Sequence, residues 1–126
     1  IMSTIKVGTL LAADGSTTTQ PSIPALDQRM ATAWVAFNGL GTVAIKGDYG
    51  VSSITDSATG NYIVNFSTTR ASVTYSAIAQ TERQVGWTDG GIDVRNQTTS
   101  SVRVLNVEYG SGAGADSPYV SVNIFG

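Results

Sequence analysis

The fold of this chain is most constrained by residues 33–66, which read AWVAFNGLGTVAIKGDYGVSSITDSATGNYIVNF. Four runs rich in β-branched and aromatic residues lie at 34–37, 42–46, 51–55 and 61–66. Gly, Asn and Asp punctuate the stretch at 38–39, 47–48, 56–57 and 60–61. This pattern predicts consecutive antiparallel strands joined by tight turns.

The last of these runs predicts part of the core. Side chains alternate between the two faces of a strand, so Tyr62, Val64 and Phe66 share one face. We expect these three residues, together with Trp34 or Phe37, to be largely buried.

The same stretch carries a sequence resemblance. The residues concerned are 33–35 (AWV), 37–39 (FNG), 43–46 (VAIK), 51–56 (VSSITD), 59–60 (TG), Tyr62 and 64–66 (VNF). They resemble a module found near the C-termini of bacteriophage tail-fibre and other virion-fibre proteins, many of them from marine and cyanobacterial phages. That module opens close to AWVNFNG and continues through NVSSITDxGTGxYTVNFTT. The chain departs from it at Ala36, where Asn is usual, and at Ile63, where Thr is common.

The resemblance covers residues 33–69 well and the remainder more loosely. Residues 3–11, STIKVGTLL, are similar to short openings of the type MSTIKVxTI, and SPYVSVNIFG at 117–126 resembles the module's closing strand. The resemblance implies a virion location and a homotrimer whose N-terminal segments associate. It also implies contact with other virion proteins through that segment and with host cell-surface polysaccharide through the head.

Composition narrows the possible functions. At 126 residues the chain predicts one domain with a real core. Only 13% of residues are charged and the net charge is −2, which gives no electrostatic footprint for nucleic acid or an anionic membrane. No apolar run approaches the ~20 residues that cross a bilayer. Cysteine and histidine are both absent, so thiolate and imidazole ligands are excluded.

The chain has few residues that are suited to catalysis, and we expect neither an enzyme nor a cofactor. We interpret the carboxylates Asp48, Asp56, Asp89 and Asp93 as turn residues, because Asp is common in turns for structural reasons. A serine nucleophile would need a lysine base, and neither Lys6 nor Lys46 lies in a recognisable motif. Asp89 and Asp93 supply closely spaced oxygen ligands but no recognised calcium loop, so we expect no metal site.

The N-terminal part, residues 1–24, is expected to be an extended anchor and linker. Its apolar residues, Ile5, Val7, Leu10 and Leu11, precede a polar stretch with a turn signal at Asp14–Gly15. A short segment cannot bury these side chains alone, so we assign them to oligomerisation. A helix is a possible reading of residues 25–33.

Residues 25–126 are expected to form the head. Further strands are predicted at 71–80, 83–87, 92–95, 101–109 and 119–125. Residues 101–109 carry apolar side chains on both faces, which indicates burial by a second sheet or by a partner chain. Together these elements predict an all-β fold, an antiparallel β-sandwich of about eight strands.

Two surfaces are candidates for ligand binding. A sugar ring could stack on Trp87 while Asp89 accepts hydrogen bonds from its hydroxyls, although Trp87 as a core residue and Asp89 as a turn residue is the competing interpretation. The second candidate is the glycine-rich loop 110–117 between Tyr109 and Tyr119, for which a mobile hairpin is the alternative.

The resemblance therefore implies a virion fibre protein that binds a host-surface glycan, and the few residues suited to catalysis lead us to expect no enzyme. Two other functions stay open. One is a capsid decoration or fibre-assembly protein with no receptor of its own, and the other is a depolymerase acting on surface glycans.

Overall fold

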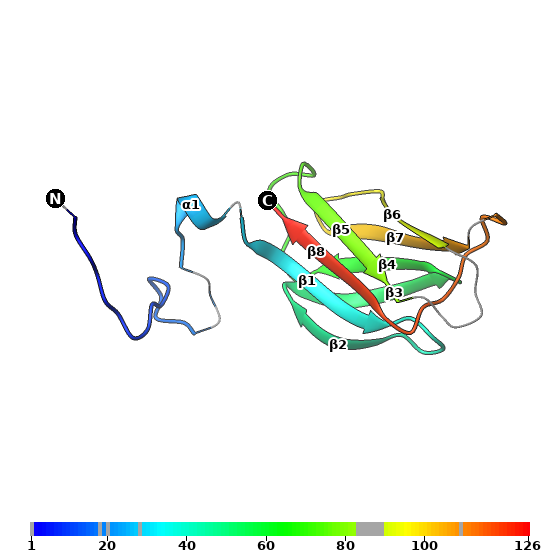
Figure 1. The fold of residues 1–126 in the computed structure, drawn as a ribbon, viewed down its shortest axis with the longest axis horizontal. Coiled ribbons are helices and arrows are strands. Elements are labelled where there is room, and N and C mark those ends of the chain that lie inside the picture. Colours follow the sequence, from blue (N-terminus) through cyan, green and yellow to red (C-terminus); the bar gives the residue numbers. More distant parts are fainter. Residues whose placement is uncertain (1, 18, 20, 28, 83–89, 109) are drawn as a thin grey trace.

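The computed structural model describes residues 2–17, 19, 21–27, 29–82, 90–108 and 110–126 (Figure 1). Within these residues the elements are α1 (Pro24–Asp27), β1 (Ala31–Asn38), β2 (Ala44–Tyr49), β3 (Val51–Ala58), β4 (Asn61–Phe66), β5 (Ser76–Thr81), β6 (Gly90–Arg95), β7 (Ser101–Glu108) and β8 (Val120–Phe125). The first sheet has the strand order β2-β1-β8-β5, and the second has the order β3-β4-β7-β6. All of the strand pairs are antiparallel, so the predicted all-β sandwich is confirmed.

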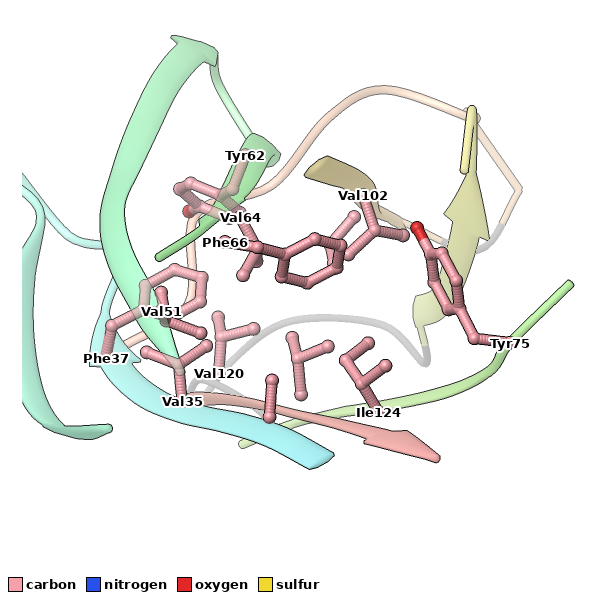
Figure 2. Close-up of a cluster of buried hydrophobic side chains, with 13 residues drawn as sticks. Val35, Phe37, Val51, Tyr62, Val64, Phe66, Tyr75, Val102, Val120 and Ile124 are labelled. Atoms are coloured by element: carbon pink, nitrogen blue, oxygen red, sulfur yellow. The ribbon is translucent and has the colours of Figure 1, made fainter. Parts of the chain in front are cut away.

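The core lies between the two sheets and follows the alternation of side chains along each strand (Figure 2). Tyr62, Val64 and Phe66 of β4 are buried, as predicted. Of the pair Trp34 and Phe37, Phe37 is the buried member, and its ring meets that of Tyr62 edge to face with 5.1 Å between the centroids. The other strands contribute mainly β-branched side chains: Val35, Val51, Val102, Val104, Val120, Val122 and Ile124.

The connection between β2 and β3 differs from the predicted succession of paired strands. These two strands are separated only by Gly50 and belong to different sheets. Gly50 has a φ of 67°, and a Cβ there would lie 3.1 Å from the carbonyl oxygen of Thr32, so glycine suits this sharp crossing. The turn signals at 47–48 and 56–57 instead lie inside β2 and β3.

The N-terminal segment contains no helix or strand among its described residues up to Ile23. The predicted turn at Asp14–Gly15 is present, where the Gly15 amide donates to the carbonyl oxygen of Ala12 at 2.9 Å. The helix prediction for 25–33 is wrong beyond its first residues, because α1 ends at Asp27 and β1 begins at Ala31. Pairing of β1 with β8, which starts at the Ala31–Phe125 pair, outweighs the weak local helix signal.

The loop at 110–117 is packed into the sandwich over its second half, unlike the mobile hairpin considered from the sequence. The Ala115 amide donates to the carbonyl oxygen of Asn106 at 2.9 Å, and Asn106 Nδ2 donates to the carbonyl oxygen of Ala115 at 2.7 Å. A Cβ on Gly114 would lie only 2.0 Å from the carbonyl oxygen of Thr59, so the two backbones meet where only glycine fits. Ala115 and Ser117 are buried.

Candidate binding site

The outer face of the first sheet gathers exposed aromatic side chains. The strand registers align Tyr49 of β2 with Trp34 of β1, Trp34 with Asn123 of β8, and Asn123 with Ile78 of β5. The adjacent row contains Gly47, Ala36, Ser121 and Gln80. We call these eight residues the aromatic face. Their side chains point away from the core, because the alternate positions of β1 and β8 are the buried ones.

The indole of Trp34 lies over Gly47 on the neighbouring strand. A Cβ on Gly47 would stand 3.4 Å from both Cη2 and Cζ3 of the Trp34 ring. Because Gly47 and Ala36 present little or no side chain, the ring has room to lie along the sheet. Trp34 and Tyr49 each remain 39% exposed. The result is a flat, partly solvated aromatic surface on a rigid strand.

Polar groups stand beside this ring. The side chains of Asn123, Gln80 and Ser121 make no hydrogen bond to another described residue. Gln80 is exposed, while Asn123 and Ser121 are half-buried. Each amide therefore offers both donors and an acceptor to a ligand that approaches the face.

A hollow adjoins each end of the aromatic face. One, of about 360 Å³, is lined by Trp34 and Tyr49 and also by Leu10, Leu11 and Met30. The other, of about 430 Å³, is lined by Gln80, Thr81, Glu82 and Tyr119. The face is thus a shallow strip with a depression at either end.

Tyr119 is the one predicted ligand-binding residue that the structure describes. It is 39% exposed, and the Lys46 ammonium lies 5.2 Å from its ring centroid while donating to the carbonyl oxygen of Pro118 at 3.3 Å. Its own carbonyl accepts from the amide of Glu82 at 2.9 Å. Trp87, Asp89 and Tyr109 lie outside the described residues, as does the strand predicted at 83–87.

Trp34 was missed as a surface residue by the sequence reasoning, which considered it only for the core. The run AWVAF indicates the outward position of Trp34, because Val35 and Phe37 lie on one face of a strand and Trp34 lies on the other. With one face of β1 covered by the second sheet, an aromatic residue of opposite parity to Phe37 is directed outward.

The residues assigned to oligomerisation are exposed in the single chain. The exposed fraction is 87% for Ile5, 61% for Val7, 58% for Leu10 and 43% for Leu11. Met2, at 92%, extends the same apolar series. Leu10 and Leu11 border the first hollow, and Ile5 and Val7 are the more open pair.

Two titratable side chains, Arg70 and Tyr75, serve the fold. The Arg70 guanidinium lies over the rings of Phe66 and Tyr75, 5.1 Å and 4.9 Å from their centroids, and donates to Thr32 Oγ1 and the carbonyl oxygen of Gly126. Burial lowers the pKa of Arg70. Burial also raises the pKa of Tyr75, whose hydroxyl donates to the carbonyl oxygens of Thr98 and Ser101. The cluster ties the two sheets together at one end of the sandwich.

Of the four carboxylates weighed for catalysis or metal binding, the three that the structure describes lie on three different strands, and Asp89 is outside the described residues. Asp48 is on β2, Asp56 is on β3, and Asp93 on β6 forms an exposed ion pair with Arg95 at 2.5 Å. In the described part of the chain no three acidic side chains come together in a way that could hold a metal ion. The same residues include no helix long and apolar enough to cross a membrane.

Comparisons of the chain with models of known protein families, with curated proteins and with solved structures find no match.

Proposed function

We propose that this chain is a virion fibre protein that contributes structure and attaches to a host-surface glycan without catalysing a reaction. The resemblance at residues 33–69 favours the virion setting. The observation that carries the proposal is the contrast between the two parts of the molecule. The head has a complete core of its own, while Met2, Ile5 and Val7 of the N-terminal segment are exposed.

An exposed apolar segment beside a complete head suits an anchor. Burying such side chains is favourable by about 25 cal/mol for each Å² of apolar surface, and the single chain leaves this gain unused. Three copies around an axis would bury Ile5, Val7, Leu10 and Leu11 against one another and leave Lys6 outward. We therefore propose a homotrimer, with the anchor also the part that meets other virion proteins.

The aromatic face supports the attachment role of the head. Exposed aromatic rings are suited to sugars, which present apolar ring faces edged by hydroxyls, when they lie beside amides that bond to no other described residue. Three copies in one trimer would raise a weak single-site affinity through multivalency.

Fibre assembly or capsid decoration without a receptor is the second candidate. The exposure of the N-terminal segment favours it equally, because an anchor is needed in either case. The two candidates differ in whether the head binds a glycan.

The test combines solution mass with a glycan array. The full chain at micromolar concentration is expected to have the mass of a trimer. The variant I5S/V7S/L10S/L11S is expected to be monomeric, and the matched control S3A/T4A/T9A, altered at polar positions of the same segment, is expected to stay trimeric. A monomeric parent contradicts the trimer. A trimer that binds no glycan on the array favours the assembly role.

A further inference from the structure

We propose that the aromatic face binds a neutral oligosaccharide, with Trp34 as the stacking platform. This inference rests on the proposed glycan attachment and adds the site and the ligand class. The face is distinct from the loop containing Trp87 and Asp89, which the sequence alone had favoured.

The Trp34 ring is supported on one side and accessible on the other. Trp34 lies over Gly47 at van der Waals distance and keeps 39% of its surface exposed. The ring is thus supported from below by backbone and open on the solvent side. A sugar ring can stack on such a surface without displacing a side chain. Binding then costs little ordering of the protein, since the platform belongs to a strand paired on both sides.

Two amide side chains lie next to the ring. Asn123 is the direct neighbour of Trp34 across the β1–β8 pair, and Gln80 follows one row away. Amides donate and accept hydrogen bonds, as sugar hydroxyls do, and both amides are free of partners among the described residues.

The charges on and around the aromatic face favour a neutral ligand. None of the eight residues of the aromatic face is charged. At the Tyr119 end, the nearby charges are of opposite sign, Lys46 and Glu82. An acidic sugar would find no net positive partner here to offset its desolvation. A neutral ligand matches this surface.

The length of the aromatic face favours a ligand of several sugar units. Asn123 and Tyr119 are four residues apart along one strand direction, which corresponds to roughly 13 Å at the rise of an extended chain. The two hollows lie beyond Trp34 at one end and beside Tyr119 at the other. A ligand that contacts both aromatic groups must therefore be an oligosaccharide and not a single sugar.

A second copy of the chain is the rival occupant. It would cover Asn123 and Gln80 as well as Trp34, and unpaired amides are costly to bury. The N-terminal segment offers a more apolar surface for association, with Ile5 at 87% exposure. The mixed composition of the face favours the sugar.

The experiment measures binding of hexasaccharides to the full-length protein by isothermal titration calorimetry. The neutral probes are a glucan, a mannan and a galactan hexasaccharide, and the acidic probe is a galacturonate hexasaccharide. The parent is expected to bind at least one neutral probe, with an affinity that changes little as NaCl is raised, because no charge pair is involved. The acidic probe is expected to bind more weakly.

Variants locate the site. Trp34→Ala is expected to weaken binding by about tenfold or more, Trp34→Tyr to retain most of it, and Asn123→Ala to weaken it several-fold. Trp87→Ala is the control at the competing site and is expected to bind like the parent. Unfolding midpoints and solution mass are measured for each variant, so that loss of fold or of assembly is recognised.

Several results would overturn the inference. Loss of binding in Trp87→Ala but not in Trp34→Ala would move the site to the loop, and preference for galacturonate would reverse the ligand class; attachment to glycans would survive both. A changed solution mass for Trp34→Ala and Trp34→Tyr would make the face an interface between copies. A parent that binds no hexasaccharide and no arrayed glycan would remove the attachment function itself.

Discussion

The buried hydroxyl of Tyr62 donates to Asp116 Oδ1 at 2.9 Å, and the same carboxylate oxygen accepts from the Gly60 amide at 2.7 Å. The hydroxyl is also 3.1 Å from the carbonyl oxygen of Gly39. Tyr62 is at the start of β4 in the second sheet, whereas Gly39 follows β1 of the first sheet. These hydrogen bonds therefore join the two sheets at one end of the sandwich and hold the loop before β8 against them.

Removing the Tyr62 hydroxyl tests how much these hydrogen bonds stabilise the fold. Tyr62→Phe keeps the ring packed on Phe37 but removes the hydroxyl donor from the Gly39 carbonyl oxygen and from Asp116 Oδ1, which then accepts only from the Gly60 amide. We expect a loss of about 1–3 kcal/mol in the free energy of unfolding, measured by urea denaturation. Tyr119→Phe, which removes a hydroxyl from an exposed ring, is the control and should match the parent. Equal midpoints for both variants would show that the Tyr62 hydroxyl contributes nothing net.

The same residue predicts how stability responds to alkaline pH. Burial, reinforced by the hydrogen bond to Asp116, raises the pKa of Tyr62 above its ordinary value of 10.0. Below pH 10 the tyrosine is neutral in both folded and unfolded chains, and its contribution is fully present. Above pH 10 the unfolded chain ionises first, so stability falls, by up to ~1.4 kcal/mol for each pH unit from this group.

Urea midpoints between neutral pH and pH 12 measure this dependence. Tyr62→Phe should lose stability less steeply than the parent above pH 10, although Tyr75, whose pKa is also raised by burial, still contributes. Parallel curves for parent and variant would exclude Tyr62 as a source of the alkaline slope.

Much of the fold could be predicted because it follows from local patterns. Alternation in 61–66 identified Tyr62, Val64 and Phe66 as core residues, and the turn signals at 38–39 and 60–61 fall at strand ends as predicted. The change of sheet at Gly50 could not be predicted, since a glycine suits a hairpin and a crossing equally well. Which strands pair is decided by long-range packing, and the pairing of β1 with β8 joins residues about 90 positions apart.

The candidate site could be predicted from the sequence less well than the fold. The search for aromatic residues beside glycine-rich turns found Tyr119, which the structure places near the end of the aromatic face. It did not find Trp34, because the row Tyr49–Trp34–Asn123–Ile78 draws one residue from each of four strands. Their proximity depends on register, and register is set by the whole sandwich.

Phe66 points into the core and Trp34 points away from it, so replacing each by alanine tests these orientations. Phe66 is 8% exposed and meets Tyr75 edge to face at 5.7 Å, so Phe66→Ala should cost about 3–5 kcal/mol. Trp34 is outside the core, so Trp34→Ala should cost about 1 kcal/mol or less. Both are measured by thermal and urea unfolding. A Phe66→Ala protein that melts within a degree or two of the parent would contradict the strand phasing.

The last prediction concerns Gly47 as the support of the Trp34 ring. Its backbone is not in the left-handed region, so Ala is tolerated, and an alanine Cβ would just reach the ring at 3.4 Å. Gly47→Ala should therefore keep oligosaccharide affinity and stabilise the protein by about 0.4–1 kcal/mol, because it restricts the unfolded chain. Gly47→Leu places a branched side chain where the ring now lies and must tilt the indole off the sheet. We expect this variant to stay folded, since β2 is an edge strand and Gly47 is outside the core, but to lose binding to a degree similar to Trp34→Ala. Titration of the neutral hexasaccharides, with unfolding midpoints recorded alongside, measures both effects. If Gly47→Leu binds as tightly as Gly47→Ala, the flat seating of Trp34 is irrelevant to recognition, and the ligand must contact the protein elsewhere.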